Sequence, residues 1–299
     1  MHIDAGEGRG IRAVVGGLCE RFADAGIEDP AADAELIVGH VLGVSRGRVQ
    51  ALAVMGRELD GAQLAAVTEL ADERARRVPL QHLTGRAPFR SIELSVGPGV
   101  FVPRPETEMV AQFAIDELLA VPDPSPLALD LCTGSGAIAL SIAHEVETAR
   151  VLAVEKSREA HAWAARNVAE WGDGRVELRL GDVGDLDAGR DSEGVPLAGR
   201  VSVLVSNPPY VPEGMVPRDP EVRDHDPELA LYSGADGLDL IRVISRIGLE
   251  AVRPGGLLVL EHAEHQGRAI RELLSADGWR AAATHPDLTG RDRATTARR

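Results

Sequence analysis

From residue 106 onward, apolar segments with the character of buried strands alternate with segments of helical character. In order, the apolar segments read LALDLC, RVLAVE, RVELRLGD, VSVLVSNPP and GGLLVLEH, and helical stretches such as AWAARNVAEWG lie between them. Neighbouring parallel strands need long crossovers, which helices usually supply. The alternation therefore predicts an α/β domain built on a doubly wound, mostly parallel sheet. We expect a last pair of segments, WRAAATHPD and RATTARR, to form a hairpin at the sheet's edge.

The first 85 residues have a different period. Apolar residues recur at helical spacing in AADAELIVGHVLG and again in GAQLAAVTELADERARR, which predicts a helical domain over residues 1–85. The segment APFRSIELSVGPGVFVPRPETE then changes to a strand-like period rich in Gly and Pro. We therefore expect a β-hairpin linker at residues 86–103 and the sheet domain at residues 104–299.

The charge balance bears on the choice of partner. Acidic residues outnumber basic ones by 47 to 32, and the net charge of −15 disfavours general binding to a nucleic-acid backbone. The two cysteines, Cys19 and Cys132, lie far apart in sequence and predict neither a disulfide framework nor a metal knuckle. We expect a nucleic acid to be a weaker candidate partner than a protein.

The sequence also predicts the location of the chain. No apolar run approaches the roughly 18 residues of a membrane span, and the first ten residues, MHIDAGEGRG, have no apolar signal-peptide core. We expect a cytoplasmic protein with no membrane contact. The polar, glycine-rich segment DLDAGRDSEGVPLAGR, residues 185–200, is typical of a surface loop.

A glycine-containing loop, DLCTGSGAIAL, follows the first strand of the predicted sheet. Gly134 and Gly136 allow a sharp turn and a close approach of the backbone to a ligand at a helix N-terminus. With Ala139 they satisfy the spacing of a dinucleotide site, and Glu155 at the end of the next strand can accept hydrogen bonds from a ribose diol. By itself this pattern also fits other nucleotide-like cofactors, or a tight turn without a ligand.

Two acidic residues favour S-adenosylmethionine over NAD as the cofactor. Asp130 lies four residues before Gly134, where a carboxylate can meet the ammonium group of an amino-acid-bearing cofactor but would repel a pyrophosphate. Asp182 follows the third strand, where it can accept a hydrogen bond from the exocyclic amine of an adenine. The alternative for Asp182 is a loop aspartate that caps a turn.

The tetrapeptide NPPY, Asn207 to Tyr210, follows the fourth strand of the predicted sheet. Its prolines fix φ and remove two N–H donors, so the segment ends the strand and presents carbonyls and side chains. Asn207 Oδ1 and the Pro208 carbonyl can accept hydrogen bonds from a planar NH₂ group, orient it and support the positive charge that builds during methyl transfer. The Tyr210 ring can cover a planar amide or base. The alternative is a plain strand-ending turn.

Six motifs together resemble a known family. PLQHLTGRAPF, FVPRPETE, DLCTGSGAIAL, NPPYVP, LALYSGADGLDL and DLTGRDRATTAR occur in this order between residues 79 and 298. They resemble the HemK/PrmC family of peptide-chain release factor glutamine methyltransferases. NPPY alone also fits adenine and guanine methyltransferases, whereas its combination with PRPETE and GADGLD is specific.

The resemblance implies a doubly wound class I S-adenosylmethionine-dependent methyltransferase sheet with an N-terminal helical domain that recognises the protein substrate. It also implies methylation of N5 of the glutamine in the Gly-Gly-Gln motif of class-one release factors. Asn207, Pro208, Pro209 and Tyr210 would hold the glutamine, and we expect Asn207 to face the cofactor as well. The other residues expected along the cofactor are Asp130, Cys132, Thr133, Gly134, Ser135, Gly136, Glu155, Asp182 and Val183.

The chain departs from the family pattern at a few positions. Cys132 stands where glycine is common, which raises the idea of a nucleophilic thiol. Direct in-line transfer needs no covalent enzyme intermediate, and no histidine is evidently paired with this cysteine. Glu155 stands where aspartate is commoner and keeps a carboxylate for the ribose. His262 and His265 suggest a metal pair, but two histidines alone are not a site, so we expect no metal.

Three alternative functions remain open at this point. An amino-methyltransferase acting on adenine or guanine would share the NPPY chemistry, although the net charge of −15 makes its basic groove hard to find. A catalytically idle binding protein could use the helical domain for docking to release factors. An NAD oxidoreductase would need a hydride-transfer acid or base, and none is evident.

Overall fold

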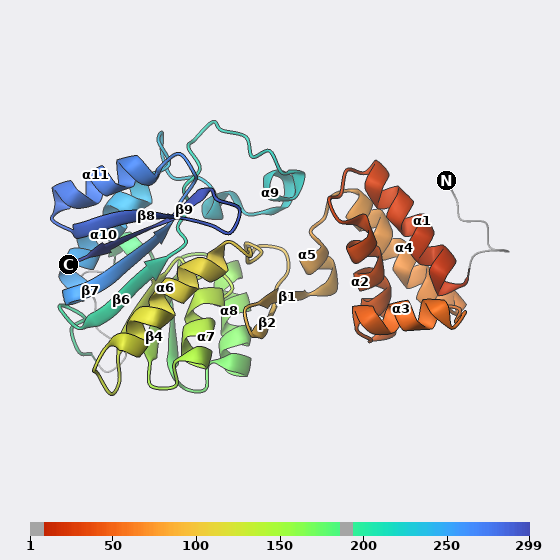
Figure 1. Cartoon of the computed structure of the whole chain (residues 1–299), viewed down its shortest axis with the longest axis horizontal. Helices are drawn as coiled ribbons and strands as arrows, with labels where there is room; N and C mark the ends of the chain where they lie inside the picture. Colours follow the sequence, from red (N-terminus) through yellow and green to blue (C-terminus); the bar gives the residue numbers. More distant parts are fainter. Residues whose placement is uncertain (1–8, 186–193) are drawn as a thin grey trace. The chain divides into compact units, whose positions relative to one another are not determined.

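The computed structural model describes residues 9–185 and 194–299. The chain divides into two compact units. A helical unit contains the residues up to Gly85 and a distant segment, Pro217–His225, while a sheet unit contains Arg86–Val216 and Asp226–Arg299 (Figure 1). Part of the surface loop predicted at residues 185–200, and most of the N-terminal decapeptide, lie outside the described residues.

The helical unit is built from helices that pack around one apolar core. Asp29 caps the second helix by accepting a hydrogen bond from Ala32 N at 3.1 Å, and Asp60 and Gln63 form a capping box at the fourth. The helices of this unit are α1 (Ile11–Asp24), α2 (Pro30–Leu42), α3 (Arg46–Val54), α4 (Gly61–Ala75), α5 (Leu80–Thr84) and, from the distant segment, α9 (Pro220–His225). The core contains Phe22, Ile37, Val38, Val49 and Val67.

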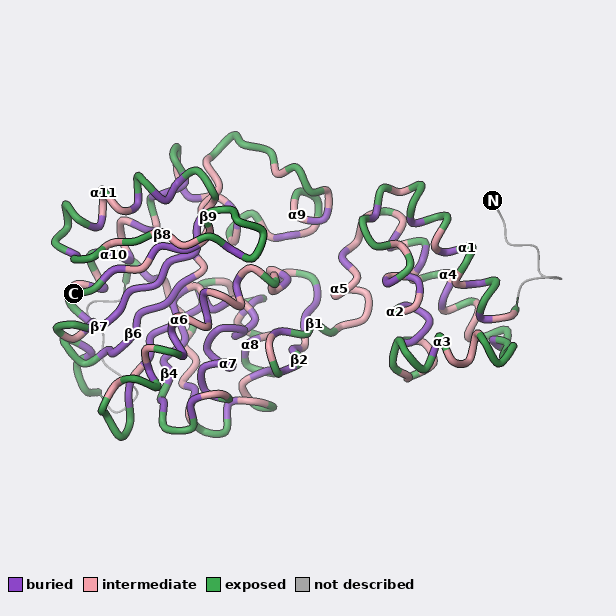
Figure 2. The backbone as a smooth tube through the Cα atoms, in the orientation of Figure 1, coloured by how far each residue is buried: buried purple, intermediate pink, exposed green. Residues whose placement is uncertain are grey.

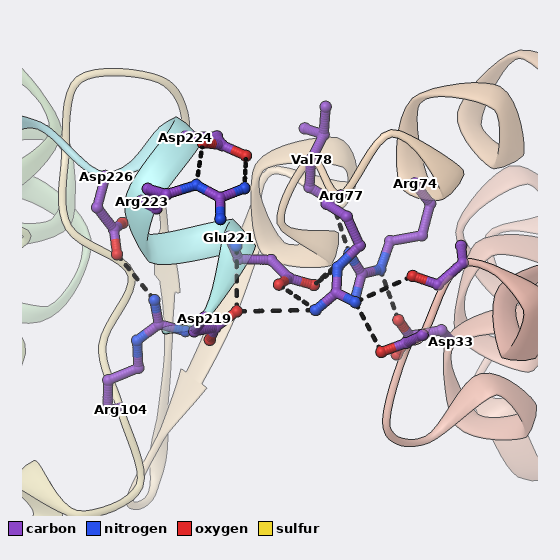
Figure 3. A network of polar contacts seen from close by, with 12 residues as sticks. Asp33, Arg74, Arg77, Val78, Arg104, Asp219, Glu221, Arg223, Asp224 and Asp226 are labelled. Atoms are coloured by element: carbon purple, nitrogen blue, oxygen red, sulfur yellow. Dashed lines mark hydrogen bonds and ion pairs between the residues drawn. The ribbon is translucent and has the colours of Figure 1, made fainter. Parts of the chain in front are cut away.

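The distant segment is held to the helical unit by Glu221 of α9. Its carboxylate accepts hydrogen bonds at 2.8 Å from Arg74 Nη1 and from Arg77 Nε, and it forms a second ion pair with Arg77 (Figure 3). Arg74 also pairs with Asp33 of α2 at 2.6 Å. Only 7% of Glu221 and 6% of Arg74 is exposed, so these charges depend on one another for compensation.

The sheet unit contains a seven-stranded sheet with the order β5-β4-β3-β6-β7-β9-β8. All its neighbouring strands are parallel except where β9 pairs with β7 and with β8. The hairpin of β8 and β9 lies at one edge, as the sequence predicts. The strands are β3 (Leu127–Leu131), β4 (Arg150–Glu155), β5 (Val176–Leu180), β6 (Val201–Ser206), β7 (Val252–Glu261), β8 (Arg280–Pro286) and β9 (Asp292–Arg298).

Helices cover both faces of this sheet, which confirms the predicted doubly wound fold. Alternate residues of each strand enter opposite cores: Leu129 belongs to one cluster and Ala128 to the other. Figure 2 shows the central strands β6 and β7 buried along much of their length. One core includes residues of α6 (Thr107–Ala120), α7 (Ala137–Glu145) and α8 (Arg158–Trp171), and the other includes residues of α10 (Asp239–Ala251) and α11 (Gly267–Asp277).

A small hairpin precedes the large sheet in the chain. Its strands β1 (Arg86–Phe89) and β2 (Ile92–Ser95) pair antiparallel, and Phe89 and Ile92 join the core beneath α6, α7 and α8. Among the described residues, the short 3₁₀ helices η1 (Val183–Asp185) and η2 (Glu228–Ala230) complete the regular elements. Within residues 9–185 and 194–299, no helix has the length and apolar character that a membrane crossing needs.

Glu221→Ala is expected to lower the free energy of unfolding by about 3 kcal/mol, because it leaves two buried or half-buried arginines without their shared carboxylate. The pKa of Glu221 would be raised by burial, but its hydrogen bonds lower it to about 2. Its contribution is therefore present above pH 4.5 and is lost as the pH falls toward 2. Urea titrations at pH 7 followed by circular dichroism measure the loss.

Asp224→Ala is the matched control in the same helix. Asp224 pairs with Arg223 at 2.7 Å, but about half of each side chain is exposed. Removing such a surface pair should change the free energy of unfolding far less than Glu221→Ala does, because solvent screens the two charges. Equal losses in the two variants would contradict a special role for the buried network.

Candidate active site

The candidate site lies where β3 and β6 end side by side. These strands are neighbours in the sheet, and their register pairs Leu131 with Ser206. Ser206 Oγ donates a hydrogen bond to the Leu131 carbonyl at 2.6 Å. From β3 the chain continues to β4 and β5 on one side, whereas β6 leads to β7 on the other. Ligands of open α/β sheets bind at such a switch point, beyond the carboxyl ends of the strands.

The loop after β3 turns through left-handed backbone conformations. The φ angles are 61° at Cys132, 59° at Gly134 and 87° at Gly136, which directly precedes α7. Glycine adopts this region freely, whereas a side chain there costs about 1–2 kcal/mol. The conformation explains why glycine is the unstrained choice at position 132. Burial raises the pKa of the Cys132 thiol, so the group stays protonated and is unsuited to act as a nucleophile.

Asp130, at the end of β3, holds this loop by hydrogen bonds. Its Oδ2 accepts hydrogen bonds from Thr133 Oγ1 at 2.6 Å and from Ala139 N at 3.1 Å. The residue is completely buried, and Oδ1 has no partner among the described residues. Burial raises the pKa of Asp130 to about 7, although both hydrogen bonds oppose the rise. One oxygen therefore holds the loop, and the predicted contact of Asp130 with a cationic cofactor stays a prediction.

Glu155, the last residue of β4, contacts the same loop. Its Oε2 accepts a hydrogen bond from Gly134 N at 2.9 Å, and its Oε1 accepts one from Ser157 N at 2.7 Å. Burial raises its pKa, while these backbone donors lower it. Each carboxylate oxygen has a further lone pair, so the predicted contact with ribose hydroxyls remains available.

Asp182 follows β5 on the far side of Glu155. Its Oδ2 forms an ion pair with Lys156 Nζ at 2.8 Å, and its Oδ1 accepts a hydrogen bond from Gly184 N at 2.8 Å. Lys156 and then the Gly184 amide lower the pKa of this half-exposed carboxylate. The neighbouring Val183 is buried. An adenine amine would share Asp182 with Lys156, and the predicted adenine contact stays a prediction.

Thr133 and Ser135 are buried within the loop. Asn167, which the sequence motifs did not single out, helps to hold the loop in place. Asn167 Nδ2 donates to the Ser135 carbonyl at 2.9 Å and to the Ser95 carbonyl at 3.0 Å. Asn167 is fully buried on α8. The available signal was its position three residues after the apolar Ala164, on the face of the helix that turns inward.

The loop that follows β6 consists of Asn207 to Tyr210, the NPPY tetrapeptide, and is called the acceptor loop below. It is fixed at both ends. At its start, Asn207 Nδ2 lies 3.3 Å from Thr107 Oγ1. At its end, the Tyr210 carbonyl accepts a hydrogen bond from Gln266 Nε2 at 2.9 Å. Gly237 has a φ of 78°, and a Cβ atom there would lie 2.2 Å from the Tyr210 carbonyl oxygen, so only glycine fits at that position. The two predicted hydrogen-bond acceptors, Asn207 Oδ1 and the Pro208 carbonyl, thus lie in a segment that is held at both ends.

The side chains of the loop lie at the edge of the buried core. Pro208 is buried, and Asn207, Pro209 and Tyr210 are half-buried. The Tyr210 hydroxyl lies 3.5 Å from Oε1 of Glu261, the last residue of β7. Burial raises the pKa of Tyr210, which therefore carries no charge at neutral pH.

His262 has a structural environment of its own. Its Nε2 lies 2.8 Å from Thr295 Oγ1 and its Nδ1 lies 2.8 Å from the Ala263 carbonyl, so protein atoms occupy both ring nitrogens. The part of the chain that the structure describes contains no group of three or more His, Cys, Asp or Glu residues placed to bind a metal.

Comparisons with known proteins test the expected family and fold class. Residues 17–85 match the model of the PrmC N-terminal domain, and residues 128–202 match that of a methyltransferase domain. A release factor glutamine methyltransferase of Streptomyces coelicolor is 48% identical over 97% of this chain and 98% of its own length. The corresponding protein of Bifidobacterium longum is 42% identical over 95% and 97%. The chain belongs to the release factor glutamine methyltransferase family. The expected family and fold class are confirmed.

A solved member of this family provides a structural comparison. The release-factor-specific protein-(glutamine-N5) methyltransferase of Alicyclobacillus acidocaldarius is 26% identical, with a TM-score of 0.39 over 69% of this chain and 98% of that one. The sequence matches, rather than this superposition, establish membership of the methyltransferase family.

Asp130→Asn is expected to flatten the pH dependence of stability. A carboxyl group whose pKa rises from 3.8 to about 7 on folding contributes stability that is fully present below pH 3.8 and is lost as the pH rises through 7, by at most about 1.4 kcal/mol per pH unit. Asparagine keeps an oxygen for Thr133 and Ala139 but carries no charge. Free energies of unfolding at pH 5 and pH 8 measure the difference.

The exposed Asp123 serves as the control. Asp123→Asn should leave the change in unfolding free energy between pH 5 and pH 8 as in the wild type, whereas Asp130→Asn should reduce it. Equal changes in the wild type and in Asp130→Asn would show that Asp130 is ionised in the folded protein throughout this range.

Proposed function

We propose that the site at the ends of β3 and β6 transfers a methyl group from S-adenosylmethionine to N5 of the glutamine in the Gly-Gly-Gln motif of class-one release factors. The observation that carries the proposal is the pairing of Leu131 with Ser206. This pairing places the glycine loop and the NPPY loop next to each other in a chain of this family. The cofactor and acceptor loops of a methyltransferase must be adjacent for in-line transfer.

The residues of the glycine loop fit S-adenosylmethionine. The buried Oδ1 of Asp130, which has no partner among the described residues, suits the ammonium group, because an uncompensated buried charge gains most from an opposite charge. Glu155 suits the ribose diol, Asp182 the adenine amine and Val183 the face of the ring. Bound there, the cofactor would supply an electrophilic methyl group on a positively charged sulfur.

The residues of the acceptor loop fit a carboxamide. Asn207 Oδ1 and the Pro208 carbonyl would accept the two N–H groups of the glutamine side chain and support the charge that develops on nitrogen. Pro209 and the Tyr210 ring would cover the flat amide. The nitrogen can lose its proton after the methyl group has arrived, so no strong base is needed at the site.

The helical unit would serve recognition of the whole release factor. The motif analysis found no catalytic constellation in it, and its match is to a domain specific to this family. Removing residues 1–85 would also deprive Glu221, which lies in the distant segment, of its partners Arg74 and Arg77. Point variants on the surface of the helical unit are therefore a cleaner test of recognition than a truncation.

The test of function is intact-mass and peptide mapping of a class-one release factor incubated with this protein and S-adenosylmethionine. We expect a gain of one methyl group, about 14 Da, confined to the Gly-Gly-Gln glutamine. A release factor with Gln→Ala at that position is the control and should stay unmodified. Methylation of adenine or guanine in nucleic acid, or binding of the release factor without any mass change, would favour the alternative functions.

Asn207→Ala is expected to lower the methyl-transfer rate by roughly 10²-fold or more, on the scale of a lost oriented polar contact. Asn207→Asp keeps an acceptor oxygen but adds a charge and removes the NH₂ donor, so it should retain more activity than Ala. Single-turnover rates at saturating release factor measure both. Affinity for S-adenosylhomocysteine, measured by calorimetry, should change much less. A wild-type rate in Asn207→Ala would show that NPPY serves only as a turn.

A further inference from the structure

The GADGLD motif, residues 234–239, lies against the backbone of the acceptor loop. At Gly237 the two segments approach so closely that a Cβ atom would lie 2.2 Å from the Tyr210 carbonyl oxygen and 2.7 Å from Gln266 Nε2. Close-packed protein interiors have no room for such an atom. The methyl-transfer step proposed above uses no side chain of this motif, so the close approach points to a task for its backbone.

The segments that adjoin this approach pair with each other. Val211 N donates a hydrogen bond to the Leu231 carbonyl at 2.7 Å, and Ser233 N donates one to the Val211 carbonyl at 3.0 Å. Glu213 N donates to the Gly234 carbonyl at 2.8 Å. These bonds hold the chain that leaves the acceptor loop beside the chain that enters the GADGLD motif.

The carboxamide of Gln266 joins three loops. Its Nε2 donates hydrogen bonds to the Tyr210 carbonyl at 2.9 Å and to the Asp236 carbonyl at 3.2 Å. Its Oε1 accepts one from Ala263 N at 2.9 Å. A backbone N–H can only donate and a carbonyl can only accept, so these partners fix the direction of the amide. Only 4% of Gln266 is exposed, so water competes little for its hydrogen bonds.

Gln266 is itself anchored by α11, which begins at the next residue. Its N–H donates to the Ala263 carbonyl at 3.0 Å, and its carbonyl accepts from Ile270 N at 3.0 Å. Ile270 and Leu274 of α11 are fully buried in one core of the sheet unit, and the helix packs against β8 and β9. The amide is therefore held by the core and not by the acceptor loop that it contacts.

We propose that Gln266 is a positioning residue for the methyl-transfer step. Together with the GADGLD backbone it holds the Tyr210 carbonyl, and it thereby sets the positions of Asn207 Oδ1 and the Pro208 carbonyl. The two prolines of the loop have a fixed φ, so a displacement at its end is passed back to its start. The inference rests on the proposed function, because it names what positions the groups that would bind the glutamine.

The first experiment compares Gln266→Glu and Gln266→Met. Glutamate keeps the shape but puts an oxygen in place of Nε2, opposite two carbonyls, whereas methionine removes the amide without adding a charge. Both should lower the single-turnover rate at saturating release factor and cofactor about 10-fold or more, because a misplacement of about 1 Å can cost 10²-fold. The rate is expressed per molecule that binds S-adenosylhomocysteine, a quantity that a purely stabilising residue would leave unchanged.

Gln112→Glu is the control for the first experiment. Gln112 lies on α6 in the same unit, where its side chain bonds to Arg90 and Asp116. This variant should keep the wild-type rate per binding molecule.

The second experiment separates the close approach at Gly237 from backbone strain. Gly237 and Gly255 both have a φ of 78°, but a Cβ atom at Gly255 would meet nothing within 4 Å. Gly237→Ala and Gly255→Ala therefore carry the same strain. Only Gly237→Ala should lower the rate per binding molecule, again about 10-fold or more, because only its methyl group displaces the Tyr210 carbonyl.

The third experiment combines Gln266→Met with Asn207→Ala. If Gln266 acts through the acceptor loop, its effect should shrink once Asn207 Oδ1 is gone, so the two losses should not multiply. Wild-type rates in both Gln266 variants, equal rates in the two glycine variants or fully multiplicative losses would overturn the inference and leave the function intact. Absence of any glutamine methylation by the wild type would instead reject the proposed function.

Discussion

The parallel pairing of β3 with β6 is the constraint on which the site depends. These two strands are about 70 residues apart in sequence, yet their register places Leu131 beside Ser206, and a hydrogen bond from the serine hydroxyl ties their ends together. The loops that leave these strands are the glycine loop after β3 and the NPPY loop after β6. A shift in this register would move the two loops apart and, because side chains alternate between faces, would also exchange residues between the two cores.

The carboxyl edge of the sheet concentrates buried acids. Burial raises the pKa values of Asp130, Glu155 and Glu261, each of which also accepts hydrogen bonds that hold a loop or a side chain. Asp130 and Glu261 each retain one oxygen without a partner in the described part of the chain. Such groups reduce stability at neutral pH, and a positively charged cofactor would offset the cost at Asp130.

After the acceptor loop, the chain enters the helical unit and then returns to the sheet unit. Pro217–His225 begins seven residues after Tyr210 and belongs to the helical unit, where Arg74 and Arg77 hold Glu221. Asp226, the first residue back in the sheet unit, pairs with Arg104 of FVPRPETE at 2.8 Å. The predicted two-domain division treats the chain after residue 103 as one domain. Helix α9 carries local helix signals, with Pro220 at its first position and Glu221 in its first turn, but only the tertiary structure assigns the segment to the other unit.

The sequence by itself determined the alternation of strands and helices, the glycine loop and the NPPY tetrapeptide, because each is written in neighbouring residues through hydrophobic period or backbone conformation. It also identified the family through motifs in fixed order. Only the tertiary structure decided that Thr107, Gln266 and Asn167 support these loops, since their partners lie on other elements. It likewise decided that Asp130 holds the loop with one oxygen, while its other oxygen has no partner in the described part of the chain. Burial and long-range hydrogen bonds arise from packing, and no local spacing encodes them.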